Sequence, residues 1–242
     1  MKQEIFKIVE NIPIAENVFK ITLRGGSETP RAGQFVNIKL SGLYLRRPIS
    51  VCDAENGSLT LIYKVVGKGT RQLSEMKEGS LDVLTGLGNG YDLEASGDLP
   101  LLVGGGVGVP PLYLLAKNLA AEGKSVCAVL GFNKKSEVFY ENEFRVLGCN
   151  VTVATADGSY GVKGFVTDAL PENYTHVYTC GPEPMLRAVF KAIKTSGQFS
   201  FEERMGCGFG ACMGCTCETV AGHKRICRDG PVLFKEEIKW QI

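Results

Sequence analysis

Apolar and polar residues alternate along residues 1–97, in short runs separated by turn-forming residues. The alternation is clearest at residues 35–40, 59–65 and 81–84. A period of two residues is typical of strands that bury one face. We therefore predict that residues 1–97 form an antiparallel β-barrel or sandwich domain.

Residues 98–199 follow a different pattern, in which short apolar runs alternate with helical stretches. The runs lie at 101–103, 126–130, 151–154 and 176–179, and one helical stretch covers 184–195. This order predicts an α/β domain with a parallel sheet. Residues 99–116 carry no charge but hold four glycines and three prolines. They fit a strand, a glycine turn and a helix opened by Pro110 and ended at Gly123 better than a membrane span.

Residues 200–242 show little apolar periodicity but hold five of the nine cysteines. Four of them follow the spacing C-x4-C-x2-C and then, after eleven residues, a last C, which is the ligand pattern of a plant-type [2Fe-2S] cluster. Small residues between the first two let the backbone wrap closely around a cluster. We predict a small metal-dependent subdomain whose ligands are Cys207, Cys212, Cys215 and Cys227.

Two other uses of these cysteines stay open. A zinc site also takes four thiolates, although zinc ribbons usually contain two C-x2-C pairs and only Cys212 and Cys215 form one here. A disulfide framework is disfavoured by the odd number of cysteines and by their crowding. Cys217 lies two residues beyond Cys215 and is interpreted as a bystander.

Composition and charge narrow the class of protein. The 242 residues are 44% hydrophobic, which is enough for more than one core. The net charge is +1 without a basic run, so neither nucleic acid nor an anionic membrane is an expected partner. Glu4, Glu10 and Glu16 interrupt the start of the chain where a signal peptide needs an apolar core, so we expect a cytoplasmic protein.

Two loops of the second domain suit a nucleotide. The glycine-rich turn 104–111 follows a predicted strand and opens a helix, where backbone N–H groups can hold a diphosphate. A second loop follows the strand at 176–179, and ligands collect at such strand ends. Lys134 and Lys135 leave NAD or NADP open. The candidate nucleotide residues are Gly105, Gly106, Gly108, Pro111, Cys180, Gly181 and Pro182.

The first domain carries a possible flavin site. Arginine can bind phosphate, and a serine hydroxyl can form a hydrogen bond with a flavin ring. The pair Gly69 and Thr70 precedes a predicted helix at 71–76, whose N-terminus offers a second phosphate contact. Together these elements suggest a dinucleotide flavin, held by Arg47, Pro48, Ile49, Ser50, Ile62, Tyr63, Lys64, Gly69 and Thr70.

These motifs occur in the order found in the ferredoxin reductase superfamily. End to end the chain resembles the electron-transfer subunit of NAD-linked (class 1B) dihydroorotate dehydrogenase, most specifically at 203–217 and 227–231. The resemblance implies an FAD-binding barrel (1–97), an NAD-binding domain (98–199) and a [2Fe-2S] subdomain (200–242). It also implies a partner, an FMN-containing catalytic subunit, in a heterotetramer with two copies of each chain.

A flavin converts the two-electron chemistry of nicotinamide into single-electron steps at an iron–sulfur cluster. We therefore expect electrons from dihydroorotate to pass through the cluster and FAD to NAD+ near Cys180, which borders the nicotinamide or is simply a buried thiol. His176 and His223 form no recognisable acid/base arrangement. The alternatives are a subunit of a ferredoxin-linked transhydrogenase or sulfhydrogenase, and a zinc-bearing interaction module.

Overall fold

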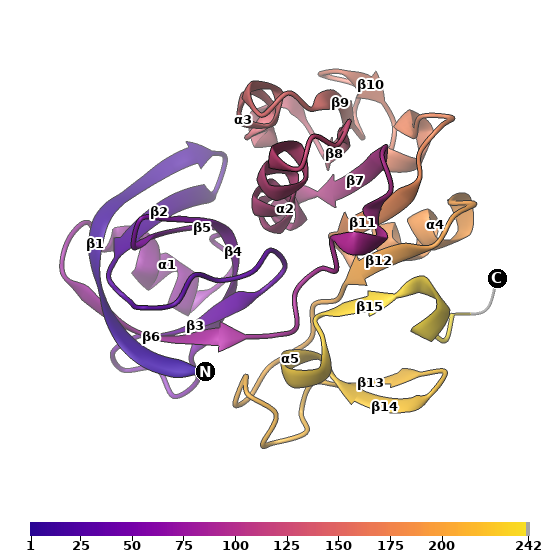
Figure 1. The fold of residues 1–242 in the computed structure, drawn as a ribbon. Helices are drawn as coiled ribbons and strands as arrows, with labels where there is room; N and C mark the ends of the chain where they lie inside the picture. Colours follow the sequence, from indigo (N-terminus) through magenta and orange to yellow (C-terminus); the bar gives the residue numbers. More distant parts are fainter. Residues whose placement is uncertain (241–242) are drawn as a thin grey trace.

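The N-terminal part of the computed structural model, which describes residues 1–240, is a closed antiparallel barrel (Figure 1). Its strands are paired in the order β1-β2-β5-β4-β3-β6. The alternating pattern in the sequence reflects this barrel, because inward side chains are buried and outward ones are solvated. The strands are β1 (Lys2–Ala15), β2 (Val18–Arg24), β3 (Phe35–Lys39), β4 (Arg47–Glu55), β5 (Ser58–Lys64) and β6 (Ser80–Leu87), and α1 (Lys68–Glu75) lies between the last two.

The second part is a seven-stranded sheet in the order β10-β9-β8-β7-β11-β12-β15. Adjacent strands of this sheet run parallel to each other, except that β15 runs antiparallel to β12. The strands are β7 (Pro100–Gly105), β8 (Cys127–Phe132), β9 (Asn150–Thr155), β10 (Val162–Lys163), β11 (His176–Cys180), β12 (Gly197–Ser200) and β15 (Val232–Phe234). The connecting helices are α2 (Pro110–Ala121), α3 (Glu141–Val146) and α4 (Glu183–Ala192).

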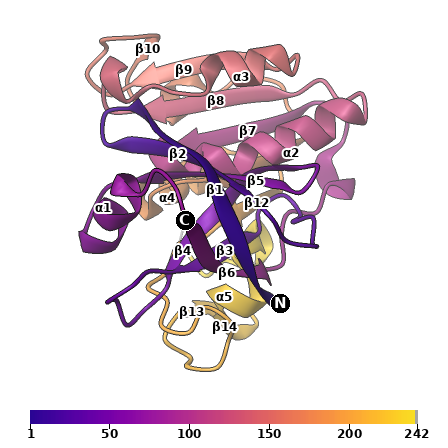
Figure 2. The same ribbon diagram turned by 90° about the vertical axis from the view of Figure 1, so that its left-hand side faces the viewer.

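The segment with the cysteine motif leaves this sheet after β12 and returns to it as β15. Between them lie the hairpin β13 (Thr216–Thr219) and β14 (Gly222–Arg225) and the short helix α5 (Ile226–Asp229), which appear below the sheet in Figure 1. Figure 2 shows the same segment beside one end of the barrel. Single 3-10 turns complete the chain at Glu94–Ser96, Gly106–Gly108, Lys135–Glu137, Val166–Ala169 and Lys235–Glu237.

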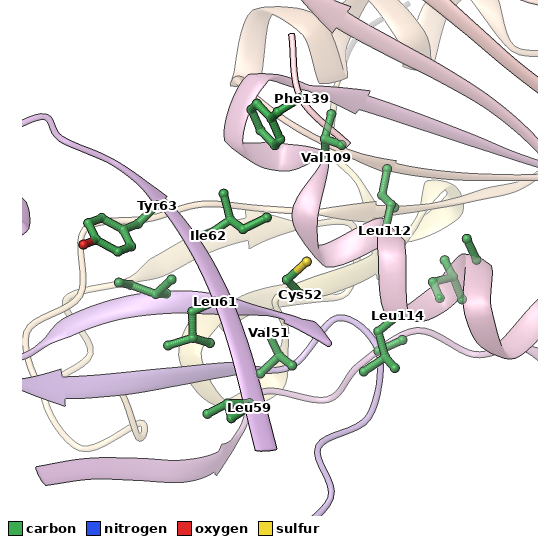
Figure 3. Close-up of a cluster of buried hydrophobic side chains, with 14 of the residues drawn as sticks. Val51, Cys52, Leu59, Leu61, Ile62, Tyr63, Val109, Leu112, Leu114 and Phe139 are labelled. Carbon is green, nitrogen blue, oxygen red and sulfur yellow. The ribbon is translucent and has the colours of Figure 1, made fainter. Parts of the chain in front are cut away.

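The barrel and the α/β domain share one hydrophobic core. Cys52 of the barrel points toward Val109 and Leu112 at the start of α2, while its neighbour Val51 lies toward Leu61 inside the barrel, as Figure 3 shows, and all these side chains are fully buried. Burying such a side chain stabilises a fold by about 1.5–3 kcal/mol. At the rim, Lys117 of α2 forms ion pairs with carboxylates of β4. The two domains are therefore packed against each other by α2.

The predicted fold class is confirmed, with three local differences. The first domain helix begins at Lys68, because extended Gly67 precedes it and the Thr70 hydroxyl accepts the Gly67 N–H at 3.2 Å. Gly69 and Thr70 therefore lie inside its first turn. Helix α4 ends at Ala192, where Ile193 turns extended. The sheet also gains an antiparallel edge from β15. No helix within residues 1–240 is long and apolar enough to span a membrane.

His176 is buried in the sheet as a neutral imidazole whose Nε2 accepts a hydrogen bond. The backbone of Asp92 orients the Gln198 side chain through two hydrogen bonds of 2.8 Å. The Asp92 N–H donates to Gln198 Oε1, and Gln198 Nε2 donates to the Asp92 carbonyl. Gln198 Nε2 therefore faces His176 Nε2 at 3.3 Å as a donor. Burial lowers the pKa of His176, although Glu236 and Asp92 oppose this shift.

We predict a pH-dependent loss of stability from this histidine. Because its pKa is lower in the folded chain, the unfolded chain binds the extra proton first, and stability falls as pH drops below about 6.5. Between pH 7 and pH 5.5, the melting temperature of a His176→Gln variant should fall by less than that of the unsubstituted chain. Exposed His223 replaced by Gln is the control and should keep the original slope. Identical slopes for all three proteins would contradict the assignment.

Candidate functional site

The four predicted iron ligands lie in two pairs. Cys207 and Cys212 exchange N–H···S hydrogen bonds of 3.4 Å in each direction. The Cys227 N–H donates to Cys215 Sγ at 3.4 Å, and both of these residues are 2% exposed. Arg225 braces the loop, because its guanidinium reaches the Gly210 carbonyl at 2.8 Å.

This pairing fits a binuclear cluster better than a single metal ion. A structural zinc ion needs its ligands to converge on one point. The structure instead brings the thiols together as two pairs. Two irons bridged by sulfide need two thiolates each, which is what two pairs provide.

The loop also prepares one thiol for metal binding. Partial burial opposes ionisation of Cys207, but the N–H groups of Phe209, Cys212 and Ala211 donate to its sulfur and lower its pKa to about 6. Burial, followed by the neighbouring Cys215 thiol, raises the pKa of Cys227 to about 12. Metal binding to Cys227 must therefore displace a proton.

The two nucleotide loops meet at the carboxyl ends of β7 and β11. Gly104 and Cys180 are direct neighbours in the parallel pair. A Cβ atom on Gly108 would lie 2.2 Å from the Cys180 carbonyl oxygen, so only glycine permits this approach. A Cβ atom on Gly105 would lie 2.4 Å from Met185 Sδ of α4. The structure thus brings together the glycine turn and the loop of Gly181 and Pro182, while α2 begins at Pro110 and Pro111 as predicted.

The Cys180 side chain is partly buried between these loops. Burial raises the pKa of its thiol to about 12, against the hydrogen bond from Ser200. At neutral pH the group is therefore a protonated thiol and not a thiolate nucleophile.

The flavin motif lies where β4 faces the start of α1. The Arg47 guanidinium packs over Gly69 so closely that a Cβ atom there would lie 2.1 Å from Arg47 Nε. A guanidinium beside a helix N-terminus suits a diphosphate. These features fit FAD, which would find its phosphate partners here.

Other residues of the predicted flavin site are buried or already contact other side chains. Ile62 and Tyr63 are each 3% exposed, and the Tyr63 hydroxyl donates to Asn11 at 2.9 Å inside the barrel. Lys64 lies 3.7 Å from the Glu137 carboxylate of the other domain. Ser50 is half-buried on β4.

A cavity of about 1030 Å³ joins the three parts of the chain. Arg47 and Pro48 line it from the barrel, and Gly181 and Pro182 line it from the α/β domain. Its third wall was not predicted from the sequence. That wall comes from the loop before β4, from residues 201–205 and from Trp240, which packs on Phe201 with ring centroids 5.3 Å apart. Phe201 and Trp240 are the sequence features that could have indicated this wall, but they lie far apart in the chain.

The lysines that left NAD or NADP open are both engaged. Lys134 forms an ion pair of 2.8 Å with Glu16, on the turn between β1 and β2. Ser136 also donates to that carboxylate, at 2.7 Å. Lys135 lies over the Tyr160 ring. The barrel thus supplies a negative charge beside Lys134.

Comparisons with known proteins agree with this layout. The family model for the iron–sulfur cluster binding domain of dihydroorotate dehydrogenase B matches residues 202–239, and that for the oxidoreductase NAD-binding domain matches 102–191. The chain is 46% identical to the electron transfer subunit of dihydroorotate dehydrogenase B (NAD(+)) from Bacillus pumilus, with 98% of each chain covered. The same subunit from Fusobacterium nucleatum is 42% identical, with 99% of each covered.

Among solved structures, a chain of the NADH-dependent reduced ferredoxin-NADP oxidoreductase superposes with a TM-score of 0.88. It is 33% identical, and the match covers 97% of this chain and 90% of that one.

Proposed function

The chain belongs to the family of electron transfer subunits of NAD-dependent dihydroorotate dehydrogenase B, and from this premise we propose that it carries electrons from a dihydroorotate-oxidising catalytic subunit to NAD+. The observation that supports the proposal is that three motifs of matching chemistry lie on domains that pack against each other in one structure. They are the paired thiols, the flavin motif and the two nucleotide loops. When bound, FAD supplies the exchange between two-electron and one-electron chemistry.

Each site has a separate task for the residues of this chain. Arg47 and the first turn of α1 bind the flavin diphosphate, and the Ser50 hydroxyl orients the ring. The glycine turn and the Gly181 loop hold the nicotinamide dinucleotide where strand ends face the cavity. The Cys180 thiol forms a wall beside the nicotinamide and excludes water there. The paired cysteines hold the cluster.

The finer assignments concern the assembly. We propose that the catalytic partner contains FMN and that two copies of each chain form a heterotetramer. We also propose a cytoplasmic location, since nine free cysteines suit a compartment that keeps thiols reduced.

The deciding experiment is a visible spectrum with iron, sulfide and flavin analysis of the purified chain, prepared anaerobically, alone and with its catalytic partner. Two irons, two sulfides and one FAD per chain are expected, with NADH bleaching the flavin. Colourless protein, or zinc in place of iron, would remove the proposal and favour a zinc-bearing interaction module.

A related function deserves the same test, because the solved structure with a TM-score of 0.88 belongs to a ferredoxin-linked enzyme. The partner separates the two. Dihydroorotate should reduce the FAD of this chain only when the catalytic subunit is present. A co-purifying partner that lacks FMN and dihydroorotate activity would instead identify a subunit of another complex.

A further inference from the structure

Asn37 connects the barrel to the cluster loop. It lies on β3, is 1% exposed, and its Nδ2 group donates to the Cys207 carbonyl oxygen at 3.3 Å. A carbonyl oxygen can only accept, so this contact fixes which end of the amide faces the loop.

The loop backbone rests directly on this side chain. A Cβ atom on Gly208, the residue after the ligand Cys207, would lie 2.3 Å from Asn37 Nδ2. Gly208 has a φ of +80°, so the loop turns here in a conformation that other residues rarely adopt. The position of Cys207 is therefore set against Asn37.

The strand of Asn37 is also paired with the strand that carries the flavin motif. In the pairing of β3 with β4, Asn37 lies opposite Pro48, and its neighbour Ile38 lies opposite Arg47. The Asn37 carbonyl accepts a hydrogen bond of 3.3 Å from Arg46, which also forms an ion pair with Asp82 at 2.9 Å. One residue thus contacts the strand of the flavin motif and the loop of an iron ligand.

Packing alone does not account for an amide here. Asn37 Oδ1 is buried and has no hydrogen-bond partner among the described residues. A half-satisfied buried amide is less favourable than an apolar side chain of the same size. Such exceptions to the rules of stability are expected at functional positions.

We propose that Asn37 is a positioning residue that holds the Cys207 loop in register with the flavin motif, and so sets one-electron exchange between the cluster and the flavin. The proposal rests on the proposed function. Hydrogen bonds around a metal site orient its ligands and tune its potential.

The test replaces Asn37 by Leu in the full chain, assembled with its catalytic partner. Flavin content and the rate of flavin reduction by NADH should be unchanged. Electron transfer to the cluster should slow by roughly 10–100-fold, as for other residues that orient metal ligands. The electron paramagnetic resonance spectrum of the reduced cluster should shift.

Gln34→Leu is the matched control. Gln34 is another buried barrel amide, but its side chain donates to the Gly88 carbonyl at 2.8 Å and accepts from the Arg31 N–H, and it forms no hydrogen bond with Cys207 or Gly208. This variant should keep the original spectrum and transfer rate. If the Leu variant loses FAD as well as iron, Asn37→Asp decides, since it keeps the size but faces the Cys207 carbonyl with a second acceptor.

The outcomes are distinct. A shifted spectrum and slow transfer in either Asn37 variant that retains FAD would support the proposal. An original spectrum and rate, or misfolding of both Asn37 variants while Gln34→Leu folds, would overturn it. Failure of the proposed function is seen separately, as an unsubstituted chain without iron or flavin.

Discussion

Replacing Cys212 by serine is expected to leave the protein without its cluster while FAD stays bound. Cys212 Sγ accepts the N–H groups of Cys207 and Gly214, each at 3.4 Å, and its residue is exposed at the surface of the loop. A serine hydroxyl does not supply the thiolate that iron–sulfur clusters need. Iron and sulfide should fall to background, and electron flow from dihydroorotate should fall with them.

Reduction of FAD by NADH should survive in this variant, because the flavin motif and the nucleotide loops lie on other elements. Cys217→Ser is the matched control, since Cys217 lies on β13 outside the two thiol pairs and lines the cavity. It should retain both irons. If Cys212→Ser keeps its iron and Cys217→Ser loses it, the ligand set assigned here is wrong.

Replacing Gly108 by alanine is expected to disable nucleotide binding. The new Cβ atom would lie 2.2 Å from the carbonyl oxygen and 2.5 Å from the carbonyl carbon of Cys180, and 2.6 Å from Gly181 Cα. All three atoms belong to the backbone, so no side-chain rotation relieves the clash and the two loops must separate. We expect a loss of stability of about 1–3 kcal/mol or more.

The rate of flavin reduction by NADH should fall more than about 100-fold, since an ångström of displacement in an active site costs that much. Stopped-flow measurements and thermal melts on the FAD-loaded protein check both effects. Val107→Ala is the control, because this neighbour is 38% exposed in the same turn. A Gly108→Ala protein with the original melting temperature and rate would show that the loops have room to adjust.

The sequence was sufficient for the elements whose signal is local. Alternation predicts β3, β5 and β6 of the barrel, and apolar runs predict β7, β8, β9 and β11 of the sheet, because each strand buries a defined face. The cysteine spacing predicts the ligands, and the way they divide into pairs emerges only in three dimensions. The residue assignments at the flavin and nucleotide sites stay predictions.

Features that depend on distant residues could not be predicted. One difference is local: α1 begins at Lys68 and not at residue 71, because extended Gly67 and the Thr70 hydroxyl begin the helix despite the low helix propensity of Gly69. The edge position of β15 depends on β12, more than thirty residues before it in the printed sequence. The contact of Asn37 with Cys207 joins residues 170 positions apart. No local pattern encodes such pairs.

The return of the cysteine segment to the sheet as β15 bears on how the protein matures. Both ends of the segment are anchored in the paired strands β12 and β15, which contain none of the four predicted ligands, so we expect the sheet to fold before iron is bound. Iron and sulfide can then be delivered after translation, to a folded recipient. Oxidative damage to the metal centre would likewise leave a repairable apoprotein, ready to be reloaded.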